Sequence, residues 1–562
     1  MHDTYGFPID LTEQMAEECG MTVDVTKYEQ LMEKARELAR TTSKTGVAIS
    51  PSHFQRLAKT NFVGHESMHG ESYVLNIRKG GDLAASVSEL GEGEEGALIL
   101  RETPFYAEQG GQIGDCGEIT DPVGAWRFRV DNTQKVNNVY VHLGECTLGA
   151  VKAQTPLQVG STHGLSNIRA PRTRDLAEAK LHVDEETRHA TTQNHTSTHV
   201  LNWALRKVLG DHVQQKGSLV DPDKTRFDFS TRSPMTDEQI ADVERLCREQ
   251  IEADHQVFTQ EVEQAEAREI NTLRAVFGEK YPDRVRVVSI GAPITEEDGK
   301  EVDRSDWLLK SPENEKWMQY SVEFCGGTHL QRSGEAERFV LISEEGVGKG
   351  VRRVVGISGD AAKAAAGQGD SLTAQVYARV ENPGDDLAEW LPTFQKNLDE
   401  AVIPVVKRHQ IRDALVELQK IVKQRGKKQD AAAGGAVMEV VATLLESAEE
   451  VGGVTIVVGE VPQAPADQVR GAIDWVRQKC DASAVLLAMA GEGRVTLLAG
   501  MSKKAVERGL KAGDLIREIA PIVGGKGGGK PDLAQGGGKD PSKVPDALDR
   551  ARSWLKSKLG PT

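Results

Sequence analysis

The sequence predicts a multidomain α+β protein. At 562 residues the chain is long enough for three to five domains of ordinary size. Residues 72–160 contain short β-like runs between Gly and Pro, which favours a small β-barrel. Residues 160–360 combine a long helical pattern with strands, and residues 432–562 alternate strand and helix. We therefore expect a small β-barrel, an α+β domain, a helical linker and a small α/β domain, in that order.

The elements of the first third follow from hydrophobic spacing. Residues 1–50 are predicted to be helical, because Leu31, Ala35 and Leu38 recur at helical intervals. The barrel strands include one short apolar run and two runs that alternate more clearly, at residues 97–100, 126–130 and 139–143. The expected limits of the first two domains are residues 1–60 and 61–165.

The middle of the chain is predicted to be α+β, with limits at residues 166–360. A long helix begins near Asp184, and its apolar stripe continues through Leu201 and Leu205. Strands are predicted at residues 225–229, 285–288 and 339–342.

The last third returns to helix and then to an α/β pattern. Between residues 361 and 431 one apolar stripe carries Ile411, Leu415, Leu418 and Val422, while the other faces are charged. This pattern fits a helical arm or a coiled-coil homodimer contact, and it fits equally a helix packed on its own domain. In residues 432–562 a helix is predicted from Ala466, with strands at residues 455–458, 483–487 and 494–498.

Composition excludes several classes of protein. The net charge of −16 does not suggest a nucleic-acid-binding protein, so any such role requires local basic patches, and we expect no DNA partner. The six cysteines are scattered without paired spacing, which favours free thiols in a reducing compartment. No apolar run of 18 residues and no signal peptide is found, so we expect a soluble cytoplasmic protein without a membrane segment.

Two short motifs far apart in the chain predict a metal site. His195 and His199 are four residues apart, so on a helix both imidazoles face one point. Cys325 and His329 flank a Gly-Gly turn, where backbone without Cβ atoms lets two ligands approach one ion. Nitrogen and sulfur ligands of this kind suit tetrahedral Zn²⁺ better than Mg²⁺ or Ca²⁺. Thr196 stands where a His-Glu-x-x-His metalloprotease motif has its Glu, so that chemistry is not indicated.

The sequence resembles the alanyl-tRNA synthetase family along nearly its whole length, with the motifs in the same order. The segments that carry the resemblance are residues 3–8, 103–112, 193–199, 215–218, 226–229, 325–329, 350–353 and 524–532. The resemblance implies the tail of a helical tRNA-recognition region, a β-barrel with a zinc-containing editing domain, a helical arm and a tRNA-binding α/β domain. The domain limits are those given above.

The chain departs from the family in two respects. The N-terminal half of the family pattern, with its class II ATP motif, is absent, so we expect either a fragment or the product of a shortened reading frame. Alanine activation with ATP is then expected only if the missing aminoacylation domain is supplied, and the chain alone should not catalyse alanine-dependent ATP–pyrophosphate exchange. Residues 291–318 resemble an insertion before Cys325 and are polar enough for a surface loop, to which we assign no function.

The resemblance implies hydrolysis of tRNA for alanine that has been wrongly charged with serine or glycine. A pocket sized for a methyl group excludes glycine and serine poorly, so a second site must hydrolyse the error. The expected ligands of one Zn²⁺ per chain are His195, His199, Cys325 and His329. Zinc could position the aminoacyl end, activate water or serve a structural role. The residues expected near the ester are Gln215, Thr196, Thr103, Gly110 and Gly111, with packing or turn roles as the alternative.

Contact with tRNA is expected from local charge. Residues 501–562 hold thirteen Lys and Arg against seven Asp and Glu, and Lys526 and Lys530 lie among glycines whose N–H groups suit phosphate. The resemblance adds Arg352 and Arg353. A non-catalytic tRNA-binding module that works with a separate aminoacylating chain is the alternative function, and deacylation of mischarged tRNA distinguishes the two.

Overall fold

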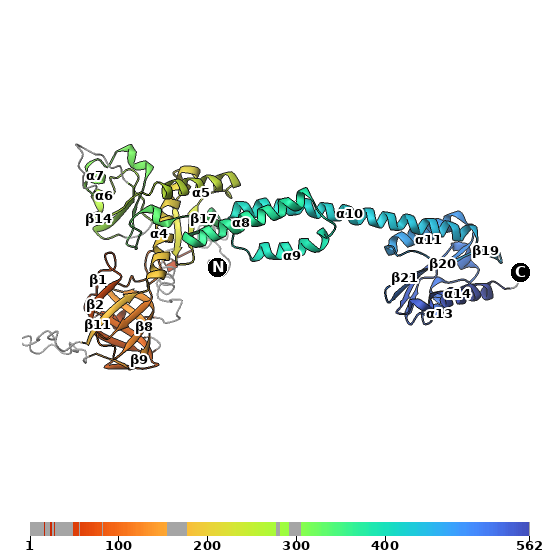
Figure 1. Cartoon of the computed structure of the whole chain (residues 1–562), viewed down its shortest axis with the longest axis horizontal. Coiled ribbons are helices and arrows are strands. Elements are labelled where there is room, and N and C mark those ends of the chain that lie inside the picture. The colour runs from red at the N-terminus through yellow and green to blue at the C-terminus, as the bar shows by residue number, and fades with distance from the viewer. Residues whose placement is uncertain are drawn as a thin grey trace, which may run out of the picture. The chain divides into compact units, whose positions relative to one another are not determined.

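A computed structural model of the chain describes residues 16, 23–24, 27–28, 49–55, 57–80, 83–153, 177–276, 281–291 and 305–560. The chain divides into two units, which are described separately below: Met1–Ala374 with Leu398–Ile411, and Gln375–Asn397 with Arg412–Thr562 (Figure 1). The helices predicted for residues 1–50 lie almost entirely outside the described residues. No helix of the described part is long and apolar enough to cross a membrane.

The first unit begins with the predicted β-barrel. A ring of antiparallel strands closes on itself because the last strand pairs with the first. In ring order they are β2 (His69–Lys79), β5 (Glu95–Leu100), β9 (Val139–Leu148), β8 (Arg127–Val136), β7 (Gly117–Thr120) and β11 (Ala177–Val183). Along β8 the apolar Phe128 and Val130 point inward and alternate with exposed arginines, as the sequence pattern predicts. The closing strand β11 lies beyond residue 165, so the barrel extends further along the chain than expected.

Shorter strand pairs lie beside the barrel. They are β1 (Asn61–Phe62) with β6 (Glu102–Thr103), β4 (Glu89–Gly91) with β10 (Ala150–Lys152), and β3 (Ala85–Val87) on β2. A 3-10 helix, η1 (Pro51–Phe54), packs Phe54 against Ile99 and Val141 in a second cluster of barrel residues.

The α+β part of the first unit packs two helices on a four-stranded antiparallel sheet. The sheet order is β12 (Gln215–Val220), β13 (Thr225–Ser230), β18 (Val351–Ser358) and β17 (Phe339–Gly348). Helix α4 (Glu185–Leu209) begins where the sequence predicts, because the Asp184 carboxylate accepts a hydrogen bond from the backbone N–H of Thr187. Helix α5 (Asp237–Glu252) begins with a capping box at Thr236. Both helices bury apolar faces against Phe227 and Phe229 of the sheet.

A three-stranded antiparallel sheet carries the second metal motif. It consists of β14 (Val257–Glu263), β15 (Arg284–Ile290) and β16 (Ser321–Phe324), with the short helices α6 (Gln264–Ala267), α7 (Ser305–Lys310), η3 (Glu315–Gln319) and η4 (Ser333–Ala336) nearby. The prediction that residues 291–318 form a surface loop is wrong for its described part. Trp317 is 1% exposed in the core of this sheet with Leu308, and its indole N–H donates to the Ser311 carbonyl. The apolar residues of this described part form two short groups, at residues 307–309 and 317–318, which are too short to give a periodic signal.

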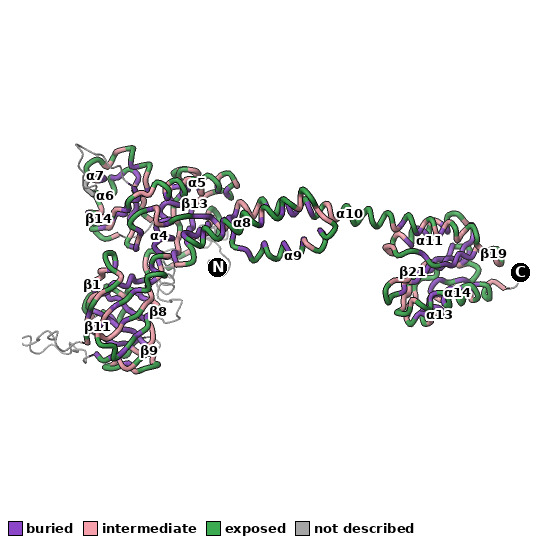
Figure 2. Tube along the Cα trace, viewed as in Figure 1, coloured by how far each residue is buried: buried purple, intermediate pink, exposed green. Residues whose placement is uncertain are grey.

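Three helices follow, and they include the predicted apolar stripe. They are α8 (Gly359–Glu381), α9 (Leu387–Glu400) and α10 (Val405–Glu446). Ile411, Leu415 and Leu418 are buried within the chain, which supports the packed-helix interpretation of that stripe. Residues 423–432 of α10 are exposed around the whole helix, as the green stretch of the tube shows (Figure 2).

The second unit ends in the predicted α/β domain. Its sheet order is β19 (Glu449–Val451), β20 (Val454–Glu460), β21 (Ser483–Gly491), β22 (Arg494–Met501), β24 (Leu533–Gly538) and β23 (Lys526–Gly529). Strands β20 and β21 are parallel and are joined through helix α11 (Ala466–Lys479), while the other pairs are antiparallel. The remaining helical segments are α12 (Lys503–Glu507), α13 (Ala512–Ile519), η5 (Pro541–Lys543) and α14 (Val544–Leu559).

Candidate metal centre

The polar middle of α4 is buried, which is unusual for such a sequence. Thr191 to His199 are all buried, and several of their side chains bond to neighbouring elements. Asn194 donates to the Asp221 carbonyl, and the Thr198 and Ser197 hydroxyls bond to those of Thr225 and Ser358. Because buried polar groups need such partners, these contacts fix the rotation of the helix. They turn His195 and His199 toward the segment that follows β16.

The structure brings the two motifs together. One ligand atom from each of His195, His199, Cys325 and His329 lies within 4.8 Å of the others. The ring centroids of His195 and His329 are 4.4 Å apart, and those of His199 and His329 are 4.8 Å apart. The two helix histidines are buried, whereas Cys325 and His329 are half-buried. The cluster is therefore reached more easily from the Cys325 side.

The donor atoms fit a tetrahedral ion of the zinc type. The His195 Nε2–Cys325 Sγ distance is 3.4 Å, close to the roughly 3.6 Å that zinc bonds of about 2.1 and 2.3 Å impose at a tetrahedral angle. Within the described part of the chain, His199 Nε2 and both ring nitrogens of His329 are buried without a hydrogen-bond partner. Buried nitrogens without partners are costly, so a cation at their centre would satisfy them.

Electrostatics favour the ligand forms of Cys325 and His329. At His199 burial lowers the pKa, but Glu323 and Cys325 outweigh that effect and raise the pKa to about 10. Burial alone would raise the pKa of Cys325, but the imidazoles of His195, His199 and His329 lower that pKa well below its usual value. Burial and the neighbouring His195 lower the pKa of His329, which keeps its imidazole neutral. A thiolate and a neutral imidazole are the forms that bind metal.

Gln112 connects both halves of the centre, although no local sequence pattern predicts this position. Its Oε1 lies 2.7 Å from His195 Nδ1 and accepts the Thr328 N–H at 3.0 Å. Its Nε2 donates to the Thr328 hydroxyl at 2.8 Å. Gln112 is fully buried, and these bonds direct His195 Nε2 toward the cluster.

Two further residues hold the centre in place. Glu323 Oε2 lies 2.8 Å from His199 Nδ1, on the side of the ring away from the cluster. Arg286 Nη1 donates to the carbonyl oxygens of Cys325 and Gly327, which fixes the turn between the ligands. Gly327 is needed for this approach, because a Cβ there would lie 2.1 Å from His195 Cε1. Gly326 has no such requirement, since its nearest neighbour would be 3.7 Å away.

Three of the predicted pocket residues meet beside the loop that carries Gln112. Gly111 lies against Ser218, and a Cβ on Gly111 would be 2.4 Å from the Ser218 hydroxyl. Gln215 Nε2 donates to that same hydroxyl at 3.1 Å. Gly110 and Gly111 both have positive φ, which glycine adopts at little cost. Residues 109–111 of the loop and strand β12 therefore lie against each other and form one wall. The side-chain amide of Gln109 lies 3.7 Å from the position that a Cβ would take at Gly326.

The other two predicted pocket residues have structural partners. The Thr196 hydroxyl accepts the Leu330 N–H at 3.1 Å, which ties α4 to the segment after β16. The Thr103 hydroxyl lies inside the barrel, 2.8 Å from His142 Nε2, and accepts the Phe105 N–H. Both side chains are at most 1% exposed, so neither is open to a substrate in this structure.

The predicted tRNA-contacting residues differ in availability. Arg352 forms a two-pronged ion pair with Glu344, and Arg353 forms one with Asp228 at 2.7 and 2.9 Å. Both arginine side chains are therefore already engaged in ion pairs within the sheet. Lys526 and Lys530 are exposed at the edge strand β23 of the second unit.

Comparison with known proteins identifies the class first. A family model described as "tRNA synthetases class II (A)" matches residues 1–161. A model of the "Threonyl and Alanyl tRNA synthetase second additional domain" matches residues 285–355, and one of the "DHHA1 domain" matches residues 453–557. The chain is thus related to class II tRNA synthetases that carry a second additional domain.

The relatives narrow this class to one family. The chain is 35% identical over 555 residues to the alanine–tRNA ligase of Hydrogenovibrio crunogenus, covering 99% of this chain and 55% of that protein. It is 36% identical over 563 residues to the alanine–tRNA ligase of a Roseiflexus species, covering 100% and 56%. The chain is therefore similar along its whole length to alanine–tRNA ligases, and it spans about 55% of the length of these relatives.

Among solved structures, the C-Ala domain from Aquifex aeolicus alanyl-tRNA synthetase is 32% identical to the part of this chain that it matches. The match covers 19% of this chain and 97% of that domain, with a TM-score of 0.19.

Proposed function

We propose that the chain hydrolyses tRNA for alanine that has been mischarged with serine or glycine, at a Zn²⁺ site formed by His195, His199, Cys325 and His329. The observation that carries this proposal is the cluster itself, in which two motifs 130 residues apart provide one ligand set. Similarity to alanine–tRNA ligases supports the substrate, because synthetases for small amino acids need a second site to remove errors.

The chemistry is hydrolysis of an ester. Water adds to the carbonyl carbon, the bond to the terminal ribose oxygen breaks, and the proton of the water passes to that oxygen, which yields free amino acid and tRNA. If one of the four protein ligands yields its position, a bound Zn²⁺ would supply a Lewis acid beside the carbonyl. Gln112 and Glu323 would hold His195 and His199 in their ligand orientations through contacts on the far side of each ring.

The wall formed by residues 109–111 and β12 is proposed to bind the aminoacyl group. Gln215 donates its amide N–H to Ser218, and among the described residues its amide oxygen has no partner. That oxygen can accept a hydrogen bond from the α-ammonium group or from the hydroxyl of a seryl ester. A hydroxyl contact would favour serine over alanine, since alanine lacks that donor.

The test is release of labelled serine from mischarged tRNA by the full chain. We expect seryl-tRNA to be hydrolysed faster than alanyl-tRNA. Chelation of the metal or Cys325→Ala should reduce the rate by about a hundredfold or more, because a Lewis acid contributes several kcal/mol. Returning Zn²⁺ should restore the chelated protein. Cys480→Ala, in the second unit, is the matched control and should leave the rate unchanged.

The alternative function, a tRNA-binding module without catalysis, predicts a different result. Such a protein would bind tRNA but release serine no faster than the uncatalysed reaction, with or without metal. Equal rates on seryl and alanyl esters would also contradict the editing proposal.

A further inference from the structure

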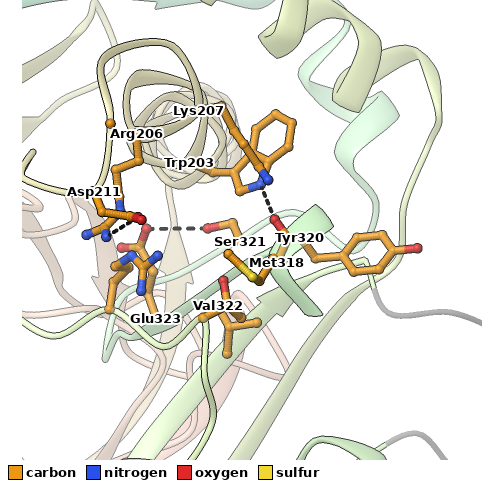
Figure 3. A pocket seen from close by; sticks show the side chains of 12 residues that line it. Trp203, Arg206, Lys207, Asp211, Met318, Tyr320, Ser321, Val322 and Glu323 are labelled. Atoms are coloured by element: carbon orange, nitrogen blue, oxygen red, sulfur yellow. Dashed lines mark hydrogen bonds and ion pairs between the residues drawn. The ribbon is translucent and has the colours of Figure 1, made fainter. Parts of the chain in front are cut away.

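A pocket of about 280 Å³ lies beside the metal centre in the first unit (Figure 3). Its walls come from the last turns of α4, from residues 272–274 after α6 and from β16. Helix α4 and β16 are the elements that also position His199 and Cys325. The lining includes Trp203, Arg206, Lys207, Arg274, Met318 and Glu323.

The pocket has cationic groups whose hydrogen-bonding capacity is only partly used. Arg206, Lys207 and Arg274 face two carboxylates, and both carboxylates already have partners: Asp211 bonds to Arg206 at 2.8 Å, and Glu323 accepts from Asn202 at 2.8 Å. Within the described residues, Arg274 uses one of its five N–H groups, toward the Leu273 carbonyl.

The positive charges are also held close together. Arg206 Nε is buried without a partner among the described residues. Burial and the neighbouring guanidinium of Arg206 lower the pKa of Arg274. An anion bound between Arg206 and Arg274 would reduce the repulsion between the two guanidinium groups. It would also accept hydrogen bonds from their unpaired N–H groups.

Trp203 provides a flat apolar surface in the same pocket. Its indole N–H donates to the Met318 carbonyl at 3.1 Å, which fixes the plane of the ring. The ring is half-buried, and Lys207 Nζ lies 5.9 Å from its centroid. Figure 3 shows Trp203 and Lys207 together on one side of the pocket, with Arg206, Asp211 and Glu323 on the other. An aromatic face next to basic groups is the combination that binds a base and its phosphate.

Glu323 and Ser321 connect this pocket to the metal centre. Glu323 lines the pocket, and its second oxygen lies 2.8 Å from His199 Nδ1. The Ser321 hydroxyl donates to the His199 carbonyl at 3.1 Å. Arg206 follows His199 by two helical turns, or about 10 Å along α4. A strand whose 3′ end is at the metal therefore reaches the pocket with the nucleotides next to that end.

We propose that this pocket binds one nucleotide of the RNA strand whose aminoacylated 3′ end is at the metal centre, with its base on Trp203 and its phosphate at Lys207 and Arg274. The inference rests on the proposed function and adds a contact that positions the substrate. A free nucleotide presents the same chemistry, so the experiment must distinguish the two sources.

The experiment compares two substrates on the full chain: a seryl minihelix that carries the acceptor strand, and seryl-adenosine, which has only the terminal nucleoside. Trp203→Leu and Lys207→Gln should each raise KM for the minihelix, by about tenfold for Trp203→Leu, and leave hydrolysis of seryl-adenosine unchanged. Trp203→Phe, which keeps an aromatic face, should stay near wild type. Arg248→Gln, an exposed cation on α5, is the charge-matched control.

Binding of the uncharged minihelix separates this inference from the proposed function. Lys207→Gln should reduce the slope of log affinity against log salt by about 0.7 to 0.9, as expected for one lost phosphate contact. If neither ester is hydrolysed but these binding changes occur, the proposed function fails and the pocket assignment survives. If seryl-adenosine loses rate as much as the minihelix, or if the variants weaken binding of cytidine monophosphate but not of the minihelix, the pocket does not bind the substrate strand.

Discussion

The side-chain amide of Gln112 bonds to both His195 and Thr328. Substitutions of Gln112 should therefore weaken metal binding at this centre. Replacing Gln112 by Ala removes the acceptor for His195 Nδ1 and for the Thr328 N–H, while the four ligands remain. Loss of such an orienting partner weakens metal binding by about 10- to 100-fold. We expect that loss in a competition titration with a zinc chelator. Gln109→Ala, in the same loop, should bind zinc as wild type does, and equal affinity of all three proteins would show that Gln112 does not orient His195.

The cluster of four candidate ligands could be predicted from sequence, but the residues that support it could not. Each of the motifs His-x-x-x-His and Cys-Gly-Gly-Thr-His places two metal-binding side chains four residues apart, a spacing that favours one shared ion. The structure brings all four side chains together. Gln112 is 83 residues from His195 and 216 from Thr328, so no local pattern could pair them. Thr196 lies beside a ligand in sequence, but its position on the helix turns its hydroxyl to the Leu330 backbone.

At the scale of elements, a buried ion pair joins α4 to the barrel. Arg188, in the first turns of α4, bonds to both oxygens of Asp115 and donates to the carbonyls of Gly64 and Pro104. Both side chains are 5% exposed. Because Gln112 comes from the barrel and His195 from the helix, this contact also keeps that hydrogen bond aligned.

Arg188→Ala should therefore destabilise this junction strongly. Removing one partner leaves the Asp115 carboxylate buried without its cation, at a cost of about 3 to 5 kcal/mol. Native-state hydrogen exchange of peptides from α4 and β8 measures the opening free energy directly. Arg129→Ala removes an exposed arginine from the same barrel, where the pairs with Asp131 and Glu145 should contribute less than about 1 kcal/mol. Similar losses for both variants would contradict the role assigned to Arg188.

The fold was predictable where patterns are local. The Asp184 cap, the strands of the C-terminal domain and the alternation along β8 all follow from short-range rules. Closure of the barrel depends on β11 pairing with β2 more than 100 residues earlier, and such register is not encoded locally. Trp317 was missed for a related reason, since one buried indole in a polar segment has no period.

At the scale of the whole chain, charge is distributed unevenly between its parts. The chain carries a net charge of −16, yet residues 501–562 have an excess of six positive charges. Lys526 and Lys530 are exposed at the edge strand β23, next to glycines that leave backbone accessible. The metal cluster belongs to the first unit and β23 to the second. We therefore predict that affinity for tRNA and the proposed hydrolysis depend on different residues and can be changed separately.

The double substitution Lys526→Gln with Lys530→Gln, in the full chain, should weaken tRNA binding and leave hydrolysis at saturating tRNA unchanged. Two lost phosphate contacts should reduce the slope of log affinity against log salt by about 1.5, because each contact releases less than one counterion. The control removes the same charge from Lys479 and Lys558, which lie on α11 and α14 of the same unit. If the control lowers the slope equally, the basic residues act through net charge alone and β23 is not a specific tRNA contact. If the double substitution slows hydrolysis even at saturation, Lys526 and Lys530 also affect the ester, and the separation between binding and hydrolysis fails.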